Sequence, residues 1–199
     1  MRQDLSIDQK RNVALAGHHG SGKTSLVEAM LYSVGAVDRV GKTEDKSTFC
    51  DYTDEEKNRQ LSIYTTLAHI EPKKFRINAL DLPGYADFLG EIASGIRVVD
   101  GTVIVMDATS GVEVETERAW KLAEEYGSAR MVVVNKLDKE RSSFETALGE
   151  LDKAFGSVCC PFQLPIGQED SFQGVVDLVK MKAFYFDDKG NISKREDIP

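Results

Sequence analysis

Cysteine is scarce in this sequence, and long apolar runs are missing altogether. The 199 residues include three cysteines, which form neither a CxxC pair nor an even disulfide framework, so we expect reduced thiols in a reducing compartment. No apolar run approaches the roughly 20 residues that span a bilayer, and residues 1–10 lack the apolar centre of a signal peptide. These absences predict a cytoplasmic protein that has no membrane partner.

Positive charge is outnumbered by negative charge. The chain has 25 lysines and arginines against 33 aspartates and glutamates, which gives a formal net charge of −8 at pH 7. Such a surface does not attract nucleic acid as a whole, which argues against sequence-specific DNA binding. Any RNA partner would have to be recognised by its shape. With 41% hydrophobic and 29% charged residues, the chain is globular. We expect a monomer with one core, or with one domain and part of another.

Short apolar runs alternate with segments of helical period. This alternation is typical of an α/β fold in which helices cover both faces of a mostly parallel sheet. One helical segment places Leu26, Ala29, Met30 and Ser33 on a shared face, which we expect to be core. The runs that predict strands are residues 12–17, 75–81, 102–108 and 131–135.

Two parts of the chain differ from the rest in composition and periodicity. Residues 36–66 are polar and charge-dense without sustained periodicity, which predicts a functional lid or switch loop. Within them, most of the charged run at residues 51–60 is expected to be a solvated face. After about Gly156, residues 161–167 and 174–186 look like strands of a second unit, with a turn at residues 187–191.

The strongest motif is 17-GHHGSGKT-24, which fits G-x-x-x-x-G-K-T between an apolar run and an amphipathic segment. Glycines let backbone N–H groups surround phosphate oxygens, the lysine reaches the outer phosphates, and the threonine hydroxyl can bind Mg²⁺. The motif predicts the three-layer fold of P-loop NTPases. Its predicted nucleotide-binding residues are His19, Gly20, Ser21, Gly22, Lys23, Thr24 and Ser25.

A second motif, 81-DLPG-84, ends the apolar run at residues 75–81. A carboxylate at this place can hold Mg²⁺ through water. The N–H of Gly84 can sense a γ-phosphate, because no side chain blocks its approach. Asp81 is therefore predicted to contact both nucleotide and magnesium, the latter together with Thr24.

A third motif, 135-NKLD-138, ends the run at residues 131–135, where a parallel sheet places its ligand-binding loops. Asp138 could accept both hydrogen-bond donors of guanine, whereas adenine would leave a buried carboxylate unpaired at a cost of about 1–3 kcal/mol. Asn135, Lys136 and Asp138 are the predicted base-binding residues. The order of the three motifs indicates a guanine nucleotide, GTP or GDP, bound with Mg²⁺.

The motif order, together with residues 95–120, resembles the GTPase domain of translation elongation factor G and its paralogues. Residues 163–183 resemble the insert that distinguishes elongation factor G from other translational GTPases. The resemblance covers nearly the whole chain. It implies a GTPase that acts on the ribosome within a longer multidomain protein and is slow in isolation.

The resemblance also implies a domain organisation. We expect a GTP-binding domain over residues 1–157 and the beginning of a small α+β insert over residues 158–199. In the family, the insert is followed by the last core strand and a Ser-Ala motif that backs the guanine base. We therefore expect the chain to be an N-terminal fragment.

Several residues depart from the family pattern. The first loop has His19 where the family has an apolar residue and Gly20 where it has an aspartate. Tyr85 stands where the family has the histidine that positions the attacking water. By the resemblance, His19 and Leu61 form a gate that faces Tyr85.

The switch motif 59-RQLSI-63 also departs from the family pattern, which is Arg-Gly-Ile-Thr-Ile. Gln60 replaces a glycine, while Ser62 keeps the hydroxyl that would bind magnesium and thereby sense the γ-phosphate.

The leading hypothesis is a Mg²⁺-dependent GTPase that hydrolyses GTP by in-line attack of water. In it His19 or Gln60 orients the water, Tyr85 donates a hydrogen bond, and the Gly84 N–H contacts the γ-phosphate. The alternative is a binding module that responds to GTP and GDP with little hydrolysis, which Tyr85 and Gly20 favour. An ATPase or small-molecule kinase is opposed by NKLD and by the long switch loop. The sequence leaves open whether the protein translocates, recycles, rescues or protects ribosomes.

Overall fold

The computed structural model describes residues 5–187 and 190–198. The strands expected at residues 12–17, 75–81, 102–108 and 131–135 are present, whereas the strands at residues 66–70 and 192–197 lie outside the predicted runs. The strands are β1 (Lys10–Ala16), β2 (Thr66–Ile70), β3 (Arg76–Asp81), β4 (Gly101–Asp107), β5 (Ala129–Asn135), β6 (Gln163–Ile166), β7 (Gly174–Asp177), β8 (Lys182–Phe186) and β9 (Ile192–Asp197). The α-helices are α1 (Lys23–Ser33), α2 (Asp54–Arg59), α3 (Leu89–Arg97), α4 (Val114–Glu125) and α5 (Phe144–Phe155). None of these helices is long and apolar enough to cross a membrane.

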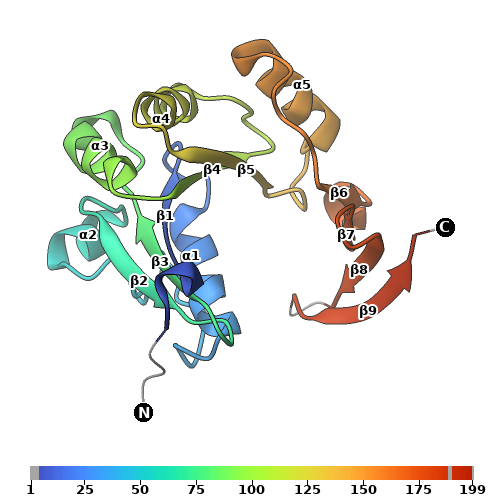
Figure 1. Cartoon of the computed structure of the whole chain (residues 1–199), viewed down its shortest axis with the longest axis horizontal. Helices are drawn as coiled ribbons and strands as arrows, with labels where there is room; N and C mark the ends of the chain where they lie inside the picture. Colours follow the sequence, from blue (N-terminus) through green and yellow to red (C-terminus); the bar gives the residue numbers. More distant parts are fainter. Residues whose placement is uncertain (1–4, 188–189, 199) are drawn as a thin grey trace. The chain divides into compact units, whose positions relative to one another are not determined.

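The larger sheet has five strands in the order β2-β3-β1-β4-β5 (Figure 1). Strand β1 runs parallel to β3 and β4, while β2 runs antiparallel to β3. The sheet is therefore mostly parallel, and the predicted α/β fold of the P-loop NTPase type is confirmed.

Helices cover both faces of this sheet. Helix α1 packs on one face against β2 and β3, where Leu15, Val27, Leu31 and Val105 belong to one buried cluster. Ala14 and Ala16 alternate with Leu15 along β1 and are fully buried on the other face, on the side of α3 and α4 (Figure 1). The three layers place the loop between β1 and α1 at the carboxyl end of a central strand.

The buried face of α1 differs from the prediction in two of its four positions. Leu26 and Met30 pack on the core from its edge, but Ala29 and Ser33 are exposed. The buried positions are Lys23, Val27, Glu28 and Leu31. The hydrophobic pattern missed this face because two of its four members are charged.

Residues 36–66 contain the short helix α2. Thr53 caps it, since its hydroxyl accepts from Glu56 N while the Glu56 carboxylate accepts from Thr53 N. The same carboxylate accepts hydrogen bonds from the backbone N–H groups of Ile63 and Tyr64, both at 3.1 Å. Asp51 and Glu56 are 2% and 0% exposed, so they are the buried exceptions in the largely solvated run at residues 51–60.

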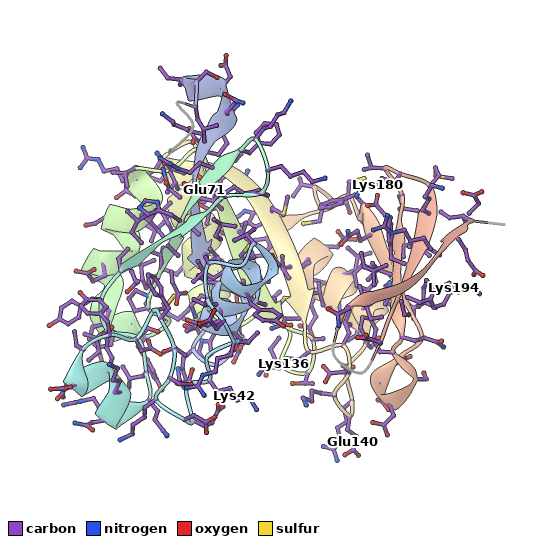
Figure 2. All side chains as sticks on the ribbon, turned by 90° about the horizontal axis from the view of Figure 1, so that it is seen from below. Lys42, Glu71, Lys136, Glu140, Lys180 and Lys194 are labelled. Atoms are coloured by element: carbon purple, nitrogen blue, oxygen red, sulfur yellow. The ribbon has the colours of Figure 1, made fainter. Side chains whose placement is uncertain are left out.

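The smaller sheet is antiparallel, in the order β6-β7-β8-β9. The predicted strand at residues 174–186 is divided into β7 and β8 by a turn, in which buried Asp177 accepts from the N–H groups of Val179 and Lys180. Lys180 and Lys194 mark this sheet in Figure 2. Of the predicted turn at residues 187–191, residues 188 and 189 lie outside the described part of the chain.

The chain forms two compact units. One comprises Met1–Met106 with Glu113–Val133, and the other comprises Asp107–Val112 with Val134–Pro199. The expected domain boundary at residues 157 and 158 stays a prediction.

Replacing Glu56 with alanine is expected to lower the free energy of unfolding of the first unit by about 1–3 kcal/mol, because the N–H groups of Ile63 and Tyr64 lose their acceptor. Urea unfolding followed by fluorescence of Trp120, the single tryptophan, measures this loss. The control is Glu55→Ala, which removes only an exposed pair with Arg59 and should cost less than about 0.5 kcal/mol. Equal losses in the two variants would contradict the role given to Glu56.

Candidate functional site

The loop from Gly17 to Gly22 joins β1 to α1 and has a conformation that requires glycine. Gly17 has φ +132°, and a Cβ at this position would lie 2.3 Å from the backbone oxygen of Val105. Gly22, with φ +97°, is the N-cap of α1. The loop therefore curls tightly in front of the N-terminus of a helix, where unpaired N–H groups favour anions.

Lys23 is the first residue of α1, and its side chain reaches into this loop and is 5% exposed. Its ammonium group donates to the backbone oxygens of Gly17 at 3.1 Å and His18 at 2.8 Å. Burial lowers the pKa of Lys23 to about 8, against the opposing effect of nearby Asp81. A phosphate would be a stronger, charged acceptor than either carbonyl.

The 81-DLPG-84 turn lies against the same loop. A Cβ on Gly84 would come within 2.6 Å of the Lys23 Nζ and 2.7 Å of the His19 backbone nitrogen. The turn is fixed by Leu82, which is fully buried and donates its N–H to Leu15 O at 3.1 Å. Only a residue without a side chain fits between the turn and the loop, which is what the predicted role of Gly84 needs.

The three predicted magnesium residues come together. The Thr24 hydroxyl donates to Asp81 Oδ2 at 2.7 Å and lies 3.3 Å from the Ser62 hydroxyl. Burial raises the pKa of Asp81 to about 6, although the Thr24 hydrogen bond works against the shift. Asp81 Oδ1 is buried and has no nitrogen or oxygen donor within the described residues, although the Cys50 thiol interacts with the Asp81 carboxylate and opposes the rise of its pKa. This set of oxygens, with one acceptor left over, fits a hard divalent cation such as Mg²⁺.

Asp51 belongs to this group but was not predicted. Its Oδ1 accepts from the Ser62 hydroxyl at 2.7 Å, and its Oδ2 accepts from the Thr48 hydroxyl at 3.0 Å. Asp51 therefore holds Ser62 beside Thr24. Asp51 was missed because it begins a charged run that was expected to be solvated. Its position directly after the apolar Cys50 is the feature that could have indicated burial.

Of the predicted gate, His19 lies against Tyr85. Leu61 is half-buried after α2 and donates its N–H to Glu56 O at 3.2 Å. The rings of His19 and Tyr85 stack, with centroids 4.2 Å apart and planes inclined by 28°. The Gln60 side chain is exposed, and its amide donates instead to the backbone oxygen of Glu44 at 3.1 Å. Gln60 has φ +54° at the C-cap of α2, a left-handed conformation that favours the glycine of the family pattern.

The remaining residues of the first loop differ in exposure. Gly20 has φ +76°, and a Cβ at this position would meet nothing within 4 Å. No other group of the described residues therefore occupies the place of the aspartate in the family pattern. Ser21 is buried, and Ser25 is exposed on the first turn of α1. His18 Nε2 lies 3.4 Å from a carboxylate oxygen of Glu113.

The NKLD loop is described separately, because all four of its residues belong to the second unit. Asn135 ends β5, and its backbone oxygen accepts from Ala108 N at 2.9 Å. Lys136, labelled in Figure 2, has φ +62° and donates to Asp107 Oδ2 at 2.6 Å. Asp138 is exposed and lies 3.4 Å from the Lys139 ammonium.

Asp107 is a further residue that the motifs did not predict. Burial alone would raise its pKa, but the hydrogen bonds from Lys136 and Thr109 outweigh burial, so the pKa lies below its ordinary value. The ionised carboxylate therefore fixes the lysine of NKLD. The backbone of the loop is held as well, because Leu137 O accepts from Glu169 N and from the Ser142 hydroxyl.

Comparison with known proteins identifies the family. Residues 8–194 match the model of the elongation factor Tu GTP binding domain. The chain belongs to this family. The crystal structure of a protein from Thermus thermophilus is similar, with a TM-score of 0.88 and 39% sequence identity over 95% of this chain. The matched region is 28% of that protein's chain.

Membership of the elongation factor Tu GTP binding domain family confirms the resemblance to translational GTPases and the assignment of guanine nucleotide as the ligand. The contacts of Lys23, Thr24, Asp81 and Gly84 agree with a nucleotide site of this family. The roles of individual residues stay predictions.

Gly84→Ala is expected to weaken binding of a non-hydrolysable GTP analogue by about tenfold or more, because the added methyl group would overlap Lys23 and His19 at a cost of about 1–3 kcal/mol. Titration with a fluorescent analogue measures the affinity. Gly90→Ala is the matched control, since a Cβ at Gly90 in α3 meets nothing within 4 Å. Unchanged affinity in Gly84→Ala would show that the turn does not lie near the phosphates.

Proposed function

We propose that this chain is the Mg²⁺-dependent GTP-binding and GTP-hydrolysing part of an elongation factor G-type protein that acts on the ribosome. The observation that carries the proposal is the contact between the P-loop, residues 17–24, and the turn at residues 81–84. It puts the buried Lys23 ammonium, the Thr24 hydroxyl and the Gly84 backbone in one place. A terminal phosphate bound by the first two would face the third.

Each residue has a stated part in the proposed reaction. Lys23 and the P-loop N–H groups bind the phosphates, and Asn135, Lys136 and Asp138 bind the base. Thr24, Ser62 and Asp81 would hold Mg²⁺, which when bound supplies positive charge against the phosphate oxygens. Ser62 is part of the switch loop and would also hold Mg²⁺. Binding of the terminal phosphate with its Mg²⁺ would therefore close the loop.

The stack of His19 and Tyr85 supports retained hydrolysis over a pure binding module. It joins two polar aromatic rings, from the residue after Gly84 and from a residue whose backbone lies against Gly84, and orienting a water needs polar groups in the right geometry more than it needs a strong base. Gln60 is the weaker candidate, because its amide is already bound to Glu44 O. In isolation the reaction should be slow, since activation in trans can be worth about 10³–10⁵ in rate.

Release of phosphate from GTP by the full-length protein, with and without ribosomes, tests the proposal. We expect many turnovers in the presence of ribosomes. His19→Ala and Tyr85→Phe should each slow the reaction by about 10–100-fold, which is less than the roughly 10²–10⁴-fold of a group that transfers a proton, and Gln60→Ala should slow it less. No stimulation by ribosomes would favour the alternative, a GTP/GDP-dependent binding module. Three variants at the full rate would remove His19, Tyr85 and Gln60 from the mechanism.

A further inference from the structure

Glu28 is a buried carboxylate that none of the nucleotide motifs includes. It lies one turn after Thr24 on the same face of α1 and is 1% exposed. Its Oε1 accepts from the backbone N–H groups of Phe49 at 2.6 Å and Cys50 at 3.3 Å. Its Oε2 accepts from Gly41 N at 3.2 Å. One side chain of α1 therefore binds the switch loop at both ends of the 41–50 segment.

Gly41 shows that the loop is shaped to receive this carboxylate. A Cβ on Gly41 would lie 2.7 Å from Glu28 Oε2 and 2.6 Å from Ser47 O. The backbone thus approaches the carboxylate to a distance that only glycine allows. The second contact, with the Ser47 backbone oxygen, shows that the loop's own backbone also requires a glycine here.

The segment that Glu28 holds leads directly to the magnesium residues. Cys50 is followed by Asp51, whose Oδ1 accepts the hydroxyl of Ser62 at 2.7 Å. That hydroxyl lies 3.3 Å from Thr24 Oγ1 on α1. The contacts form a closed ring that leaves α1 at Glu28 and returns to it at Thr24.

We propose that Glu28 is a positioning residue for Ser62. Glu28 fixes residues 49–51 on α1, whether or not nucleotide is bound. It thereby sets the fraction of time during which Asp51 holds the Ser62 hydroxyl beside Thr24. The switch loop then opens by movement after residue 51, while its first part stays attached. Glu28 touches none of the reacting groups, and its effect on hydrolysis, though not its effect on the loop, rests on the proposed function.

Hydrogen exchange in the nucleotide-free chain tests the positioning directly. Glu28→Gln keeps the size of the side chain but replaces one acceptor oxygen with an NH₂ group, which cannot accept from a backbone N–H. We expect amide exchange about tenfold faster, both in peptides covering residues 47–52 and in those covering residues 61–65. Glu117→Gln makes the same change on the exposed surface of α4 and should alter neither. Faster exchange confined to residues 47–52 would overturn the proposal.

Gly41→Ala provides a second route to the same contact. It displaces the loop from the carboxylate without changing any charge, so exchange should rise in the same two groups of peptides. Fluorescence of Trp120, buried in α4, reports whether either variant is folded as a whole. A folded Gly41→Ala protein with unchanged exchange at residues 61–65 would contradict the coupling.

Hydrolysis separates positioning from a general loss of stability. In the ribosome-stimulated reaction, Glu28→Gln should lower kcat by about tenfold and change the Kd of GDP by less than about twofold. In a Ser62→Ala background it should cause no further loss, because its effect passes through Ser62. Equal losses in both backgrounds would refute the relay. If the wild-type protein does not hydrolyse GTP, the proposed function fails, and the exchange results still decide the role of Glu28.

Discussion

Burial of two opposite charges, Lys23 and Asp81, is the constraint on which the rest of the site depends. Each is taken out of water, and the pKa of Lys23 falls to about 8 while that of Asp81 rises to about 6 because burial disfavours the charged forms. The Lys23 ammonium is held by loop carbonyls and Asp81 by the Thr24 hydroxyl. Phosphate oxygens and a divalent cation would stabilise both charges further, so the site is built at a cost that a bound nucleotide offsets.

The motifs and most of the strands could be predicted because their signals are local, whereas β2 and β9 lie outside the predicted runs. The strand ends that carry Asp81 and Asn135 follow from short apolar runs, and the P-loop follows from glycines that the turn requires. The contact of Gly84 with Lys23 also agrees with the sequence. Buried carboxylates could not be predicted in this way. Glu28, Asp51 and Glu56 look like surface residues, and their partners are backbone N–H groups and hydroxyls up to 22 residues away along the chain.

Those carboxylates explain how a polar segment without hydrophobic periodicity has a defined structure. Residues 36–66 bury few apolar side chains, so their order comes from hydrogen bonds to ionisable groups. Charge-assisted bonds are strong and directional, so a few of them can fix the loop, and the loop opens when those few bonds are exchanged for bonds to water. Such a loop is well suited to a switch, because its bound and open forms differ little in buried apolar area.

The central claim is that the chain binds guanine nucleotide, and competition for labelled GDP in the presence of Mg²⁺ tests it most directly. Residues 1–199 are saturated with fluorescent GDP, and unlabelled GTP or ATP is added. We expect GTP to displace the label at concentrations at least about 100-fold lower than ATP, because the proposed Asp138 contact would accept both donors of guanine and neither is present on adenine. Displacement by ATP as readily as by GTP would contradict the guanine assignment.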